Sequence, residues 1–176
     1  MPLLTKTTKI LVFIEGTIIM HKNAVGHTRE KIVKQNKGFF WIFRDKSVHD
    51  YRLYVPIGNA VKKLQNWKKS GAEILYLTSR RKFRELEQIR DVLKKHKFPE
   101  GKLLFRQKNQ EYRDVAESVM PNVLIEDDCE SIGGEKEMTI THIRPELKKR
   151  IKSIVVKEFE GVDHLPDKAS DLIKEC

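Results

Sequence analysis

Short runs rich in Ile, Val and Leu recur along the chain, and charged segments with helical spacing separate them. This alternation is typical of parallel βα units, in which helices cover both faces of one sheet. We expect core strands at residues 9–14, 72–77, 103–105, 123–126 and 151–156. The first is continuously apolar, as a central strand covered on both faces should be. The pattern therefore predicts an α/β fold, a Rossmann-like three-layer sandwich with a mostly parallel central sheet.

The segments between these strands carry apolar residues at helical spacing. We expect helices at residues 57–70, 82–95, 112–120 and 168–174. Gly71 follows the first of them directly, where a glycine commonly ends a helix. Residues 138–143 are expected to form one further short strand.

The length of 176 residues fits one domain, and we expect a single domain over residues 1–176. Residues 21–54 follow neither pattern and are too many for an ordinary loop. They are predicted to form a small cap-like insertion or hairpin after the first strand. The aromatic run at residues 39–43 is interpreted as the hydrophobic seam of this insertion rather than as a surface on which bases stack.

The balance of charge favours partners that carry phosphate. Lys and Arg total 35 against 25 Asp and Glu, which gives a net charge of +10. The apolar runs are far shorter than the ~18 residues that a membrane-spanning helix needs, and the first residues lack the pattern of a secretory signal. We therefore expect no membrane association and a cytoplasmic location. Cys129 and Cys176 are too few for a disulfide scaffold or a thiolate zinc site.

Polar side chains follow three of the expected strands at the point where each ends. Residues 15–17 are Glu-Gly-Thr, residues 78–80 are Thr-Ser-Arg, and residues 126–128 are Glu-Asp-Asp. Because the carboxyl ends of parallel strands meet at one edge of a sheet, we expect these groups to converge. Carboxylate oxygens suit Mg²⁺, while hydroxyls and backbone amides hold phosphate oxygens. The sequence therefore predicts a site for phosphate chemistry at this edge.

The segments KILVFIEGTI, LYLTSRR and NVLIEDD occur in this order along the chain. They resemble motifs I, II and IV of the haloacid dehalogenase-like (HAD) phosphohydrolase superfamily, and the resemblance covers roughly residues 9–160. In that superfamily, motif I is a hydrophobic strand followed by D-x-D-G-T. Its first Asp is the nucleophile and its second is the general acid and base. The resemblance implies a HAD-type version of the predicted sandwich.

The resemblance also implies a role for each matching residue. The residues implied in catalysis are Glu15, Thr78 and Lys108. Those implied in phosphate binding are Gly16, Thr17, Thr78, Ser79 and Lys108. Those implied in binding Mg²⁺ are Asp127, Asp128 and Glu15. Lys108 is the preferred base for neutralising phosphoryl charge, and Arg106 and Arg113 are its alternatives in the same stretch.

The same match puts Phe13 where the superfamily has its nucleophile. A phenyl ring has no lone pair to attack phosphorus, so the aspartyl-phosphate route is closed. We therefore expect a HAD-like phosphohydrolase-type protein that binds Mg²⁺ and a phosphorylated small molecule or nucleotide, with phosphatase activity weak or lost. The alternative is a non-enzymatic module that binds nucleic acid or protein and keeps a vestigial active site. A nucleic acid is a possible partner but is less favoured than a phosphorylated small molecule or nucleotide.

Overall fold

The computed structural model describes residues 7–37 and 46–174. Its centre is a sheet in the order β5-β4-β1-β6-β7, in which every neighbouring pair is parallel. The strands are β1 (Lys9–Phe13), β4 (Glu73–Leu77), β5 (Lys102–Leu104), β6 (Val123–Asp127) and β7 (Lys152–Val156). The predicted α/β, Rossmann-like architecture with a mostly parallel sheet is therefore confirmed.

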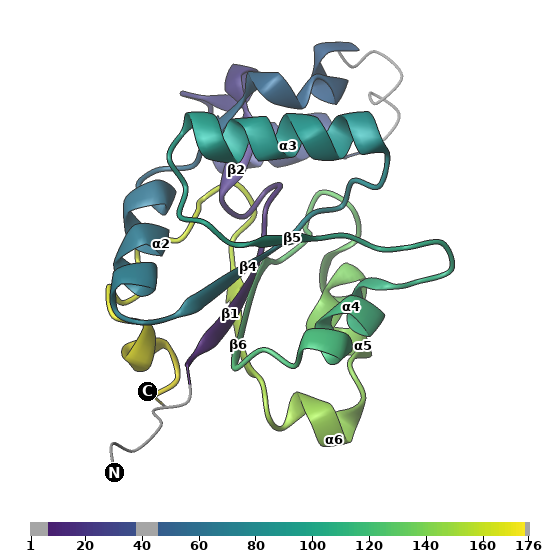
Figure 1. Cartoon of the computed structure of the whole chain (residues 1–176). Helices are drawn as coiled ribbons and strands as arrows, with labels where there is room; N and C mark the ends of the chain where they lie inside the picture. Colours follow the sequence, from purple (N-terminus) through teal and green to yellow (C-terminus); the bar gives the residue numbers. More distant parts are fainter. Residues whose placement is uncertain (1–6, 38–45, 175–176) are drawn as a thin grey trace.

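Helices cover the two faces of this sheet as separate layers (Figure 1). On one face, α2 (Ala60–Lys69) and α3 (Phe83–Lys95) pack on Ile10 and Val12 of β1. On the other face, α4 (Tyr112–Val119), α5 (Thr139–His142) and α6 (Pro145–Lys148) pack around Leu11. Consecutive residues of β1 thus face different layers, which explains why this strand is apolar throughout.

The ends of the helices follow from their sequence. Helix α2 ends at Lys69, and Gly71 adopts a φ of +93° there, as predicted for a helix-ending glycine. Helix α3 presents Leu86, Ile89 and Val92 to the core and leaves its charged side chains outside.

Residues 21–54 run from the last residue of β2 (Ile19–His21) to the first residue of β3 (Tyr54–Pro56), and these two short strands pair antiparallel. Between them stand α1 (Arg29–Asn36) and short 3-10 turns at η1 (Lys22–Ala24), η3 (Lys46–His49) and η4 (Tyr51–Leu53). The aromatic run at residues 39–43, interpreted above as a hydrophobic seam, lies outside the described residues.

Two local predictions were wrong. Residues 138–143 contain helix α5 (Thr139–His142) and no strand, because the Glu126 carboxylate accepts hydrogen bonds from the amides of Thr139 and Ile140 at 2.7 and 2.9 Å. These contacts cap the first turn of a helix. Residues 168–174 hold only the 3-10 helix η6 (Ala169–Leu172). Among the described residues, no helix has the length and apolar character to cross a membrane.

Candidate functional site

A pocket of about 410 Å³ opens at the carboxyl edge of the sheet. Its floor comes from residues that follow the strands, including Glu15 after β1, Ser79 after β4 and Asp127 at the end of β6. The insertion supplies another wall through residues such as Tyr51 and Tyr54. The predicted convergence of the strand ends therefore produces a concave site that the insertion borders.

The turn after β1 fixes the position of Asp127. Gly16 has a φ of +82°, and a Cβ there would lie 3.0 Å from Oδ2 of Asp127. The hydroxyl of Thr17, which is fully buried, donates a hydrogen bond to the same oxygen at 2.8 Å. Gly16 and Thr17 thus bring the turn after β1 against the end of β6. A side chain larger than hydrogen at position 16 would push this carboxylate away.

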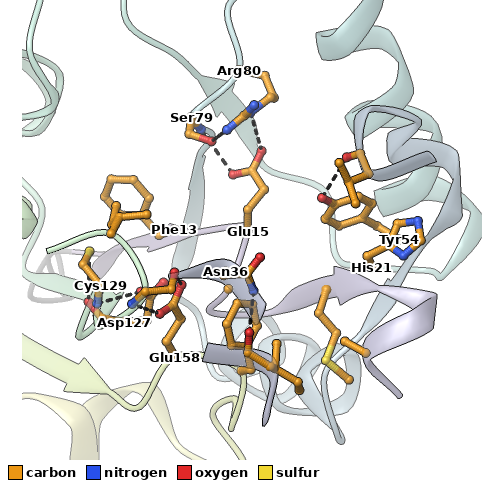
Figure 2. A pocket seen from close by; sticks show the side chains of 18 of the residues that line it. Phe13, Glu15, His21, Asn36, Tyr54, Ser79, Arg80, Asp127, Cys129 and Glu158 are labelled. Atoms are coloured by element: carbon orange, nitrogen blue, oxygen red, sulfur yellow. Dashed lines mark hydrogen bonds and ion pairs between the residues drawn. The ribbon is translucent and has the colours of Figure 1, made fainter. Parts of the chain in front are cut away.

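Glu15 engages the groups that the resemblance assigns to phosphate. Its carboxylate accepts a hydrogen bond from the Thr78 hydroxyl at 2.5 Å and from the Ser79 amide at 3.2 Å. Nε of Arg80 lies 3.8 Å from the same carboxylate. Figure 2 shows the side chain pointing toward Ser79 and Arg80 and away from Asp127 and Glu158. In this structure the donors of Thr78 and Ser79 are therefore taken by a protein carboxylate.

Burial governs the acidity of Glu15, whose side chain is 15 % exposed. Loss of solvent raises the pKa of the carboxyl above its ordinary value, and the hydrogen bond from Thr78 and the charge of Arg80 offset only part of that rise. The side chain therefore holds a proton more readily than a carboxyl in water.

Asp127, Asp128 and Glu158 form a second acidic group, and one oxygen of each lies within 4.8 Å of the others. Burial raises the pKa of Asp127 and of Glu158. Hard oxygens gathered in this way suit a divalent metal ion, and the group could hold one. Asp127 and Asp128 were predicted to bind metal; Glu15, the third predicted ligand, does not belong to this group.

Glu158 was not predicted, although it stands two residues after β7. Its carboxylate is held by the amide and the hydroxyl of Ser131 at 2.8 and 2.6 Å. The reasoning about strand ends that singled out residues 15, 78 and 127 would have found Glu158 if it had been applied to the last strand.

Arg29 of helix α1 connects the insertion to these acids. Its guanidinium lies 2.8 Å from Oδ2 of Asp128 and 2.6 Å from Oε2 of Glu130, and its Nε donates to the Glu158 carbonyl at 3.1 Å. The Arg29 side chain is 14 % exposed, whereas those of Asp128 and Glu130 are 31 % and 42 % exposed. No sequence motif marks Arg29, because its partners are about a hundred residues away.

Phe13 ends β1 and lines the pocket where the resemblance expects a nucleophile. Its ring packs edge-on against Tyr112, with centroids 5.1 Å apart. The guanidinium of Arg106 lies over the same Tyr112 ring at 4.0 Å. This end of the pocket is therefore aromatic and carries one positive charge.

The three basic residues considered for neutralising phosphoryl charge, Arg106, Lys108 and Arg113, lie in different surroundings. Arg106 lines the pocket, and its buried Nε has no hydrogen-bond partner within the described part of the chain. Lys108, the preferred base, is exposed and does not line the pocket. Arg113 pairs with Glu111 at 2.9 Å. Of the three, Arg106 is the one in position to meet a ligand in the pocket.

Comparison with known proteins adds evidence on the fold. No protein-family model and no curated protein matches the chain. It is similar to a chain in the structure of the Pnkp1/Rnl/Hen1 complex, with a TM-score of 0.53 and 14% identity over 88% of this chain and 48% of that one. It is also similar to a chain of the Pnkp1/Rnl/Hen1 RNA repair complex, with the same TM-score and identity over 87% and 44%. The chain thus spans about half the length of these neighbours, and the likeness concerns the fold.

Proposed function

We propose that this chain is a HAD-like protein whose pocket binds a divalent cation, Mg²⁺, together with a phosphorylated ligand such as a nucleotide, and that it does not transfer the phosphoryl group through an aspartyl-phosphate. One observation carries the proposal. The pocket gathers carboxylates, hydroxyls and guanidinium groups at the carboxyl edge of the sheet, and a phenyl ring stands at the end of β1.

The acidic group supports the cation. Three carboxylates come together at Asp127, Asp128 and Glu158. Among these three carboxylates, the Arg29 guanidinium forms an ion pair with that of Asp128 alone. A divalent ion would offset the remaining repulsion, and Mg²⁺ commonly pairs protein carboxylates with substrate phosphate. Bound there, the ion would supply positive charge that a phosphate requires in a pocket rich in acids.

Arg106 and Tyr112 support the phosphorylated ligand. A guanidinium without an acidic partner in the described residues binds phosphate oxygens in a fixed, two-pronged geometry. The rings of Phe13 and Tyr112 beside it offer an apolar wall to a planar group. Together they favour a ligand that has both a phosphate and a ring, which is the chemistry of a nucleotide.

The phenyl ring of Phe13 and the contacts of Glu15 argue against covalent phosphoryl transfer. Phe13 has no atom that could form a bond to phosphorus. Glu15 is directed at Thr78 and Ser79, which leaves those donors unavailable to a ligand unless its carboxylate moves. Binding without turnover is the activity that these residues support.

Calorimetry tests the proposal with Mg²⁺ and AMP as probes. Asp127→Asn should weaken Mg²⁺ binding at least tenfold, while Asp91→Asn, the same change on the exposed face of α3, should leave it unaltered. Arg106→Gln should weaken AMP binding in the presence of Mg²⁺, and Arg150→Gln, which removes one exposed charge elsewhere, should not. The proposal fails if the parent binds no Mg²⁺ at millimolar concentration, or if Asp127→Asn binds it as well as the parent.

A second candidate function is the non-enzymatic nucleic-acid-binding module with a vestigial pocket. Its support is the net charge of +10 and the exposed Phe83 at the start of α3.

A further inference from the structure

Four consecutive exposed residues lead into the first turn of helix α3, and we call them the α3 basic segment: Arg81 and Lys82, which precede the helix, and Phe83 and Arg84, which begin it. The Phe83 side chain is 78% exposed, more than any other large hydrophobic residue in the described part of the chain. The other apolar residues of α3 are buried in the core. The segment therefore holds one aromatic ring in water between positive charges.

The three cations of this segment have no acidic partner at ion-pair distance among the described residues, although other cations nearby do. Arg90 of the same helix pairs with Glu87, and Arg80 approaches Glu15. Glu85 lies within the same turn, and its carboxylate is directed at the backbone amide of Lys82 at 3.3 Å. The charge of Arg84 also lowers the pKa of Asp50, although that carboxylate is paired with Arg52 at 2.7 Å. Within the described residues, the cations of the segment are thus free of direct ion pairs and can meet an external anion.

We propose that the α3 basic segment binds single-stranded nucleic acid, with a base stacked on Phe83 and phosphates on the cations beside it. Stacking requires a base face that is not already covered, which a single strand offers and a duplex does not. Lys and Arg neutralise the phosphates on either side of that base. A membrane surface suits the segment less well, because an interfacial helix needs a broad apolar face and α3 exposes one apolar residue there.

The segment adjoins the pocket along the chain. Ser79 and Arg80 line the pocket and directly precede Arg81. The proposal does not depend on what the pocket binds, since strand binding and pocket binding use different side chains and can fail separately.

Fluorescence anisotropy with a labelled oligonucleotide of about ten nucleotides tests this surface, because single-strand sites commonly cover about 4–16 nucleotides. Phe83→Ala should weaken binding about tenfold, and Phe83→Leu should weaken it similarly because it keeps the apolar character but loses the ring. Phe83→Tyr should retain the affinity of the parent. Because Phe83 is exposed, all three variants should keep the thermal stability of the parent.

The charges are tested by the salt dependence of binding. Replacing Arg81, Lys82 and Arg84 by Gln should lower the slope of log affinity against log salt by about 2, since each phosphate contact contributes about 0.7 for a single strand. The matched control replaces three exposed cations near α6, Lys148, Lys149 and Arg150, and should keep the slope.

Three outcomes would overturn the proposal: equal binding by Phe83→Ala and the parent, equal loss in the two triple variants, or tighter binding of an acidic peptide than of the oligonucleotide. Asp127→Asn should bind the strand normally, which separates a failure of this surface from a failure of the pocket.

Discussion

Replacing Arg29 by Gln should destabilise the protein in a way that Mg²⁺ reverses. Arg29 contributes charged hydrogen bonds to Asp128 and Glu130, and its own side chain is nearly buried. A hydrogen bond to a charged group contributes about 1.5–3 kcal/mol. Glu130 is 42 % exposed and solvent screens it, so we assign the effect to the pair with Asp128, which is 31 % exposed, and expect a loss of about 1–2 kcal/mol in the free energy of unfolding.

For a chain of this length, that loss lowers the melting temperature by roughly 2–8 °C. A divalent ion on Asp127, Asp128 and Glu158 would replace part of the missing positive charge. Thermal unfolding of the variant should therefore move back toward the parent when Mg²⁺ is added, and the variant should bind Mg²⁺ at least as tightly as the parent.

The control is Arg52→Gln, which removes an exposed cation paired with Asp50 at 2.7 Å and should change little. If Arg29→Gln melts with the parent, the ion pairs between the insertion and the acidic group contribute nothing to stability. If Mg²⁺ leaves the difference in melting temperature between Arg29→Gln and the parent unchanged, the three carboxylates and Arg29 do not share a cation site.

Two further substitutions test the region around motif I. Because the pKa of Glu15 is raised in the folded state, ionising this side chain lowers the stability of the fold as the pH rises above about 4.5. Glu15→Gln should therefore have a higher melting temperature than the parent at pH 8, and this difference should disappear by pH 4. Gly16→Ala should cost about 1–3 kcal/mol through its positive φ and also weaken Mg²⁺ binding by displacing Asp127, whereas Gly26→Ala, at a φ of +80° with nothing within 4 Å, should show only the backbone cost. A flat pH response in the first case, or equal Mg²⁺ affinity of the two alanine variants, would count against these assignments.

The sequence predicted those parts of the fold and site that depend on strand order and periodicity. Continuous apolar runs identify β1 and β6 because both are covered on two faces. Once the sheet is parallel, Glu15, Thr78 and Asp127 must share one edge, and the structure brings their segments together there. This part of the site follows from topology alone.

Contacts made across long loops could not be predicted in the same way. The position of Arg29 depends on how the insertion returns over the sheet, and no local pattern encodes that path. Which of Arg106, Lys108 and Arg113 faces the pocket depends on the geometry of the loop after β5. Their spacing in the sequence does not distinguish these three basic residues. Residues 138–141 alternate between apolar and polar in a way that suits a strand. The buried Glu126 carboxylate, a tertiary contact, selects the helix instead.

Turnover of a generic aryl phosphate with Mg²⁺ tests the central claim most directly. We predict that the parent shows no hydrolysis above background and traps no acyl-phosphate, because loss of a covalent nucleophile typically costs several orders of magnitude in rate. The double variant Phe13→Asp with Glu15→Asp should gain measurable Mg²⁺-dependent turnover, since it adds the carboxylate missing at position 13 and gives the D-x-D-G-T pattern of the superfamily that the sequence resembles. Rapid Mg²⁺-dependent hydrolysis by the parent, or a double variant that binds Mg²⁺ and phosphate yet stays inert, would contradict the role assigned to Phe13.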